Sequence, residues 1–218
     1  MTRERFEGRI AGVGSESGVR LVVGHWRSTP LGSFGDVMVE RADGHRVLLA
    51  PRPEVAAFIE ATYSFDEVRI EPVRVEVSGA RWRVESPSLS LTLTTGGRTA
   101  LGRLLRLVPH RLATTPAWCA VTDPVARLVL RGVRTRGAAR EGRREYYGAT
   151  DLHTVAAAGG RFEGVDLGVL RPVEPPCRFG FSSTPARPSV TTVVTTVVTR
   201  PGGRGVTRRG TSPEAGRG

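Results

Sequence analysis

The stretch DVMVERADGHRVLLA, residues 36–50, decides the fold class. Two apolar-rich runs flank Asp43-Gly44, and an Asp-Gly pair between such runs is the strongest short-range signal for a β-hairpin. The sequence therefore predicts two strands, over residues 36–42 and 45–50, joined by a tight turn.

The strand pattern extends outward from this hairpin in both directions. Further strands are predicted at residues 6–13, 19–26, 67–77, 81–85, 89–95, 144–157, 161–165, 178–181 and 189–199. One helix, residues 53–63, interrupts the first half, because Pro53 suits a first helical turn. We expect a mainly β protein with a helical insert: an antiparallel curved sheet or a closed barrel, capped by short helices.

The charge of the chain is concentrated in two segments. The net charge is +11, and residues 98–144 carry eleven arginines against two acidic residues. Leucines recur there at helical spacing, which predicts a basic helical insert at about 98–144. Residues 200–218 are basic and nearly devoid of apolar side chains, which predicts a disordered tail. We expect a single β-rich domain over residues 1–199, followed by that tail.

The composition excludes several classes of chemistry. The chain has no lysine, so all 32 basic residues are arginine, and neither a Schiff-base lysine nor a phosphate-binding loop is available. The four histidines and two cysteines are not at ligand spacing, so we expect no metal and no cofactor. Residues 1–8 lack the apolar stretch of a signal peptide, and no run is long enough to span a membrane, which favours a cytoplasmic protein.

Polar side chains alternate along residues 145–153. Alternate residues of a strand share a face, so Glu145, Tyr147, Asp151 and His153 are expected to point the same way. If that face lines a cavity, Glu145, Asp151 and His153 form a catalytic acid/base group and Tyr147 binds the ligand. Alternatively, this face is the solvent side of a half-buried strand.

A shorter stripe of the same kind lies in the opening hairpin. Asp36 and Glu40 are separated by Met38 along one face of the predicted strand. The sequence leaves open whether this stripe faces a cavity or the solvent.

Three interpretations of the basic insert remain open. Its helices cover the sheet and expose arginine to water, or they associate with an anionic membrane surface, or they bind the phosphates of a nucleic acid. The anion-binding candidates are Arg127, Arg131, Arg134, Arg136, Arg140, Arg143 and Arg144. No recognition motif for nucleic acid accompanies them.

Several strings carry a resemblance to known proteins. GDVMVERADGHRVLLAP, FDEVRIEPV, REYYGATDLH and PPCRFGFSSTP resemble a conserved, uncharacterised family of high-GC bacteria, over most of residues 1–199. That resemblance implies no activity, ligand or catalytic residue. The strand pattern is also distantly similar to acetoacetate-decarboxylase-like and lipocalin-like barrels. The decarboxylase reaction needs a Schiff-base lysine, so the chain cannot carry it out.

No motif in the chain fixes an activity, so the functional hypothesis rests on architecture. The leading hypothesis is a small-molecule-binding β-barrel with a partly apolar cavity, whose ligand is a small apolar or anionic molecule. One alternative is a cofactor-free acid/base enzyme that uses the same cavity. Another is a scaffold or a protein that associates with anionic surfaces through the arginine-rich insert.

Overall fold

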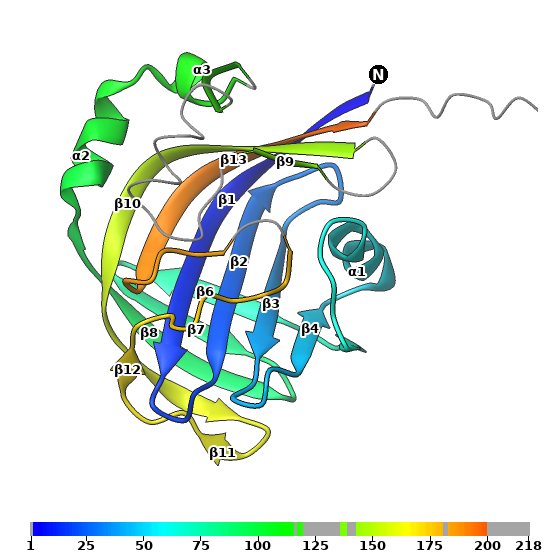
Figure 1. Cartoon of the computed structure of the whole chain (residues 1–218), viewed down its shortest axis with the longest axis vertical. Helices are drawn as coiled ribbons and strands as arrows, with labels where there is room; N and C mark the ends of the chain where they lie inside the picture. Colours follow the sequence, from blue (N-terminus) through cyan, green and yellow to red (C-terminus); the bar gives the residue numbers. More distant parts are fainter. Residues whose placement is uncertain (1, 116, 120–135, 139–142, 181–182, 200–218) are drawn as a thin grey trace, which may run out of the picture.

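The computed structural model describes residues 2–115, 117–119, 136–138, 143–180 and 183–199, which form one curved sheet of 13 strands with a few short helices (Figure 1). The strands are β1 (Thr2–Ser15), β2 (Arg20–Ser28), β3 (Phe34–Glu40), β4 (Arg46–Ala50), β5 (Glu67–Ile70), β6 (Arg74–Ser78), β7 (Arg81–Glu85), β8 (Leu89–Arg98), β9 (Arg136–Ala138), β10 (Arg143–Phe162), β11 (Val165–Asp166), β12 (Leu170–Arg171) and β13 (Ser189–Thr199). The helices are α1 (Pro53–Glu60), α2 (Ala100–Leu107) and α3 (His110–Ala113). The prediction of a mainly β fold is confirmed.

The sheet consists of two wings joined by two long strands. Its main path runs β5-β4-β3-β2-β1-β13-β10-β8-β7-β6. The first part of β10 pairs with β13 and its last part pairs with β8, with register shifts along the way. Because bulges bend a strand, β10 carries the sheet around from the first wing (β1–β5) to the second wing (β6–β8).

The two faces of the first wing pack against different parts of the molecule. On one face, Ala11, Leu21 and Val37 belong to a core cluster that also contains Trp82 and Leu91 of the second wing. Since strand residues alternate between faces, the intervening side chains point to the opposite face, which is called here the cavity face. That face packs against α1 and the segment 172–188.

The sheet curls without closing, so the closed-barrel alternative is wrong. The path ends at β5 and β6, and no backbone pairing joins these two strands within the described residues. A single strand was predicted over residues 67–77, but Pro72 lies in the three-residue link that separates β5 from β6. Proline lacks the amide hydrogen that a continuing ladder requires. The Arg69 side chain of β5 instead donates hydrogen bonds to Ser88, between β7 and β8, and to Glu163, which follows β10.

One pair of strands departs from the antiparallel pattern. The chain crosses from β4 through α1 to β5, and β5 runs parallel to β4. This crossover places α1 beside β4 at the edge of the first wing (Figure 1). The sheet is therefore mixed. Residues 178–180, predicted as part of a strand over 178–181, lie in no strand, and residue 181 is outside the described residues.

The predicted basic insert is only partly described. Residues 120–135 and 139–142 and the tail 200–218 lie outside the described residues, so the division into domain, insert and tail remains a prediction. Helix α2 confirms the helical spacing at the start of the insert and packs on the outer side of β10 (Figure 1). None of the described helices is long and apolar enough to cross a membrane.

A buried ion-pair network fastens the segment 172–188 onto the first wing. The carboxylate of Glu40 is fully buried and lies 3.0 Å from a guanidinium nitrogen of Arg20, its cross-strand neighbour. Arg178 donates to the same carboxylate from its backbone amide at 2.7 Å and from Nε at 3.0 Å. Arg20 also donates to the carbonyl oxygen of Pro175. One carboxylate thus connects two strands to their cover.

Replacement of this carboxylate tests its structural role. We expect Glu40→Gln to lower the free energy of unfolding by about 3 kcal/mol, because it leaves the buried Arg20 guanidinium without a counter-charge. Denaturant unfolding at neutral pH measures the loss. The matched control is Glu54→Gln, which removes an exposed partner of Arg52 and should change stability by less than about 0.5 kcal/mol. Equal effects of the two substitutions would contradict the assignment.

Candidate functional site

A cavity of ≈60 Å³ lies on the cavity face, between the first wing, α1 and β10. A single water needs about 10–15 Å³ on this measure, so the cavity has room for several waters or a small organic molecule. Its lining consists of Phe6, Ile10, Val22, Gly24, Trp26, Phe34, Asp36, Met38, Phe58, Ile59, Thr62, Tyr63, Glu145, Tyr147 and Thr195. The walls are mainly apolar, and a small number of polar groups face inward.

One group of polar side chains surrounds Glu145 on β10. Glu145 itself is only 3% exposed. Tyr147 donates a hydrogen bond to its Oε2 at 2.8 Å, and Thr62 donates to its Oε1. The hydroxyl of Tyr63 is hydrogen-bonded to that of Tyr147. Thr62 and Tyr63 follow the C-cap of α1, and their backbone amides donate hydrogen bonds to the carbonyl oxygen of Ile59 in its last turn. The crossover helix therefore positions two of the four side chains in this group.

The phenol of Tyr147 is held in its protonated form. Burial raises its pKa well above the ordinary value, and the nearby Glu145 carboxylate raises it further. A protonated phenol donates a hydrogen bond, which matches the bond from Tyr147 to Glu145. This group therefore supplies fixed hydrogen-bond donors and acceptors at one end of the cavity.

A second polar group, Asp36 and Trp26, lies on the first wing. Asp36 is 4% exposed, and its Oδ1 accepts a hydrogen bond of 2.8 Å from the indole nitrogen of Trp26. Gly24 faces both side chains, and a Cβ at this position would overlap Asp36 Oδ1 and Trp26 Nε1. The absence of a side chain at position 24 thus leaves the space that the Asp36 carboxyl group occupies over the sheet. Trp26 is the hydrogen-bond partner that the described residues supply to Asp36.

Burial changes the acidity of Asp36. Removal from water raises its pKa to about 6, and the hydrogen bond from Trp26 opposes this shift without cancelling it. No arginine or histidine is found among the described residues that line the cavity. Asp36 is therefore a buried carboxyl group that changes protonation state just below neutral pH.

Aromatic rings form a continuous wall next to Asp36. Phe6 stacks on Phe58 with ring centroids 4.3 Å apart, and contacts Trp26 edge-on at 6.2 Å. Trp26 in turn lies 6.3 Å from Phe34. These four side chains come from β1, β2, β3 and α1, so the wall exists only when the wing and the crossover helix are assembled.

Thr195 on β13 contributes a polar atom without a partner. The residue is 5% exposed, and its Oγ1 is buried with no hydrogen bond in the described structure. A buried hydroxyl without a partner costs about 1–3 kcal/mol. Because Thr195 lines the cavity, an occupant can supply the missing hydrogen bond.

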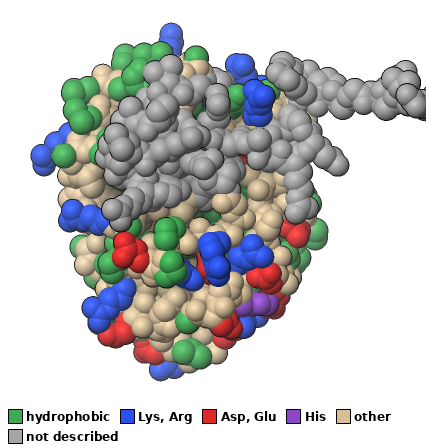
Figure 2. Space-filling model, in the orientation of Figure 1, with side chains coloured by type: hydrophobic (Ala, Val, Ile, Leu, Met, Phe, Trp, Pro, Cys, Tyr) green, Lys and Arg blue, Asp and Glu red, His purple; other side chains and the backbone are tan. Residues whose placement is uncertain are grey.

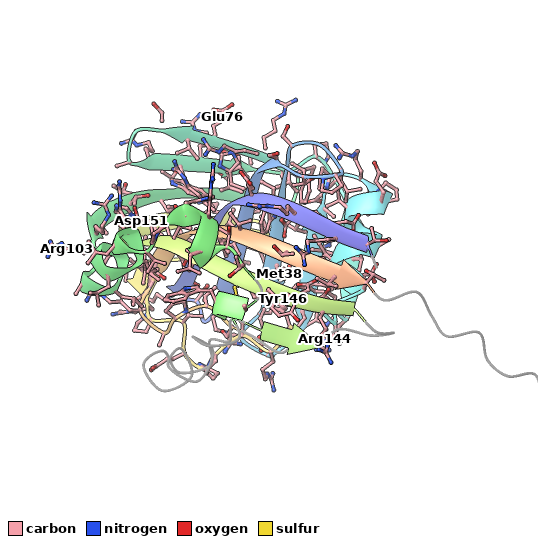
Figure 3. All side chains as sticks on the ribbon, turned by 90° about the horizontal axis from the view of Figure 1, so that it is seen from above. Met38, Glu76, Arg103, Arg144, Tyr146 and Asp151 are labelled. Atoms are coloured by element: carbon pink, nitrogen blue, oxygen red, sulfur yellow. The ribbon has the colours of Figure 1, made fainter. Side chains whose placement is uncertain are left out.

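The structure divides the predicted stripe over residues 145–153 between the two faces of the sheet. β10 pairs Ala149 with Val193 but Asp151 with Thr192, so Thr150 is an extra residue at a bulge. Paired residues share a face, and this single-residue shift moves Asp151 and His153 to the face opposite Glu145 and Tyr147. Figure 3 shows Asp151 on the α2 side of the molecule, apart from Met38, which lines the cavity. Thus only Glu145 and Tyr147 of the predicted site reach the cavity.

Asp151 and His153 form a separate polar contact at the start of α2. Arg98 Nε lies 2.9 Å from Asp151 Oδ1, and His153 Nδ1 lies 3.8 Å from the same oxygen. The Arg98 side chain lowers the pKa of Asp151 against an opposing effect of burial. The geometry is that of an ion pair joining β8 to β10, and a catalytic role of the two residues remains a prediction.

Most predicted anion-binding residues cannot be placed. Arg127, Arg131, Arg134 and Arg140 lie outside the described residues, while Arg136 and Arg143 belong to β9 and β10 without a described side chain. Arg144 is exposed on β10. Figure 2 shows hydrophobic and basic side chains gathered over α2 and α3. These include the exposed Leu104, Leu107, Leu112, Arg103, Arg106 and Arg111.

The described residues contain no group of three or more metal-ligating side chains. Cys119 and Cys177 are buried and are not joined in a disulfide, and burial raises the pKa of their thiols to about 11 and about 12. Both thiols are therefore protonated at neutral pH and are poor nucleophiles.

Sequence reasoning missed four of the seven polar residues that line the cavity. Thr62, Tyr63, Trp26 and Thr195 come from segments that share no motif and meet only through the fold. Asp36 was recognised as part of a polar stripe, and its raised pKa depends on burial by other elements. The pairing register of the two strands could have identified Trp26. Gly24 pairs with Asp36, so residues 24 and 26 lie on the same face of the sheet as Asp36.

Comparison with known proteins supplies a distant architectural likeness. No family model matches the chain, and no curated protein matches it. The acetoacetate decarboxylase of Legionella pneumophila subsp. pneumophila strain Philadelphia 1 is similar with a TM-score of 0.39 and 8% identity, covering 91% of this chain and 85% of that one. Another acetoacetate decarboxylase structure gives 0.41 and 9%, covering 90% and 84%. Of the two resemblances expected from the strand pattern, the distant one to acetoacetate decarboxylase is found, and no activity follows from it.

The raised pKa of Asp36 leads to a pH-dependent prediction. The folded protein holds this proton more tightly than the unfolded chain, so ionisation of Asp36 lowers the free energy of unfolding as the pH rises from about 4 to 6. A difference of about two pKa units corresponds to about 3 kcal/mol. We expect Asp36→Asn to stabilise the protein by up to about 3 kcal/mol at pH 8.

Denaturant unfolding at pH 8 and at the lowest pH where the protein remains folded measures this difference. The advantage of Asp36→Asn should shrink toward zero as the pH approaches about 4, because Asp36 is then neutral in both states. A pH-independent effect, or a loss of stability at pH 8, would contradict the proposed state of Asp36.

Proposed function

We propose that the cavity beneath α1 is a binding site for a small, partly apolar molecule. The observation that carries this proposal is the combination of apolar walls with inward polar groups that the protein leaves incompletely bonded. Within the part of the chain that the structure describes, Thr195 Oγ1 is buried without a partner and the Asp36 carboxyl group has a single hydrogen bond. Natural ligand sites have this composition: mostly apolar and aromatic surface with a few placed polar groups.

The two polar groups in the cavity serve different purposes in this proposal. The Glu145 group is hydrogen-bonded within the protein and fixes the shape of one end. Asp36 and Thr195 retain unused hydrogen-bonding capacity, so they are the groups that orient a ligand. An apolar ligand body would pack against the aromatic wall.

Mass spectrometry of the purified full chain tests the proposal. Under native conditions we expect a small mass excess that disappears on denaturation. Thr195→Val removes the unpartnered hydroxyl with little change in shape, so it should reduce the occupancy about fivefold or more. The matched control is Thr192→Val, on the opposite face of β13. Loss of the excess mass in both variants, or in neither, would contradict a role of Thr195 in binding.

A second candidate function, cofactor-free proton transfer at the same cavity, is supported by one observation. A carboxyl group with a pKa of about 6 can accept and donate a proton near neutral pH, as a general acid or base must. Here Asp36 takes the role that the sequence assigned to His153, since His153 lies on the other face.

Hydrogen exchange distinguishes proton transfer from binding alone. We expect a proton-transferring protein to incorporate deuterium from D2O into a carbon–hydrogen bond of the co-purifying molecule. Asp36→Asn should lower that exchange rate at least about a hundredfold, because general-base catalysis contributes about 10²–10⁴. Binding without exchange in the wild-type protein would leave the cavity as a binding site only.

A further inference from the structure

We propose that the ligand of this cavity is a small organic cation, such as a protonated alkylamine, with its ammonium group at Asp36 and its hydrocarbon part on the aromatic wall. This inference rests on the proposed function, namely that the cavity binds a small molecule. The sequence left a small apolar or anionic ligand open, and we propose a cationic ligand in its place.

The first argument is the uncompensated carboxyl group. Asp36 and Glu40 lie on the same strand and the same face. Among the described residues, Glu40 is neutralised by Arg20 and Arg178, while the hydrogen-bond partner of Asp36 is the indole of Trp26 alone. The titratable groups among the described lining residues are Asp36, Glu145, Tyr63 and Tyr147. All four are neutral or negative, so the described lining supplies no positive charge. A cationic ligand supplies it.

The second argument is the composition of the wall beside Asp36. Phe6, Trp26, Phe34 and Phe58 form a contiguous chain of ring contacts along the cavity. The face of an aromatic ring carries a partial negative charge that attracts cations, and this attraction is strongest for tryptophan. The same rings also accept a hydrocarbon chain, so both parts of an alkylammonium ion find a favourable surface.

The third argument concerns hydrogen bonds. Asp36 Oδ2 accepts no hydrogen bond from the described residues, and the buried Thr195 Oγ1 has no partner. An ammonium group carries donors and no acceptor, so Asp36 Oδ2 can accept from it, while Thr195 Oγ1 is a further acceptor elsewhere in the lining. An anionic ligand would instead place a further negative charge near the buried Asp36 carboxylate in an apolar cavity, which is strongly unfavourable.

The experiment compares three molecules with one carbon skeleton: isobutylamine, isobutanol and isobutyrate, which are cationic, neutral and anionic at pH 7.5. Binding to the full chain is followed through the indole ¹H–¹⁵N signal of Trp26, one of three tryptophans, assigned with Trp26→Phe. We expect isobutylamine to bind at least about tenfold more tightly than the other two, since hydrogen bonds to charged groups contribute about that factor.

Two substitutions of equal charge change complete the design. Asp36→Asn should abolish the preference for the amine, while Glu76→Gln should leave it unchanged, because Glu76 is exposed on β6 and far from Met38 (Figure 3). In the wild-type protein the preference should also weaken below about pH 6, as Asp36 takes up a proton.

The outcomes separate the two proposals. The proposal of a cationic ligand is wrong if isobutanol or isobutyrate shifts the Trp26 signal as strongly as the amine does. It is also wrong if the preference for the amine survives Asp36→Asn. Either result leaves the cavity as a small-molecule site. If none of the three molecules shifts the Trp26 signal at its highest soluble concentration, both the proposed binding function and the proposed cationic ligand are contradicted. A preference for the amine that depends on Asp36 supports both.

Discussion

The bulge at Thr150 in β10 determines which side chains reach the cavity. The strand is long enough to serve both wings, and before the bulge it directs Glu145 and Tyr147 to the cavity face. After the bulge its alternation is inverted, and Val155 belongs to the core between the wings. A regular strand would have placed Asp151 on the same face as Tyr147. One extra residue therefore separates the hydrogen-bonded cavity group from the Arg98 ion pair.

The bulge lies where helices of the insert meet the sheet. Gly148 allows the end of α3 to approach β10, since a Cβ there would overlap the carbonyl oxygen of Ala113. Gly102 does the same for α2, because a Cβ there would meet the backbone of Leu152. The irregular part of β10 is thus enclosed by two close helix–strand contacts.

Local sequence patterns predicted the elements that depend on local forces. The Asp43-Gly44 hairpin and the valine- and threonine-rich strand over 189–199 appear where they were expected, because turn chemistry and β propensity act over a few residues. The division of residues 67–77 into β5 and β6 was missed, although Pro72 marks it. Alternation of apolar residues continues across the link, and only the pairing partners show that the two pieces lie at opposite ends of the sheet.

The candidate site was less predictable than the fold for the same reason. Glu145 and Tyr147 could be identified because they are neighbours in sequence, on one side of the bulge. Trp26 and Thr195 join them through strand order, and that order is not encoded in any short motif. Burial of Asp36 is likewise a property of its cover. Sequence periodicity assigns a side chain to a face, while the fold decides what that face contacts.

The contrast between Asp36 and Glu40 indicates where the folded protein keeps an energetically unfavourable buried group. Both carboxyl groups are buried on β3, and two arginines compensate Glu40, whereas Asp36 and Thr195 keep unsatisfied capacity in one cavity. A fold under selection for stability alone would place an apolar residue at position 36, since burial of an uncompensated carboxylate is unfavourable. Natural proteins carry such defects mainly at functional sites, where a ligand completes the missing interactions. In the proposed binding site, Asp36 is therefore the group that an occupant's polar atoms would complete, and the hydrogen-bonded Glu145 group would hold the walls in place.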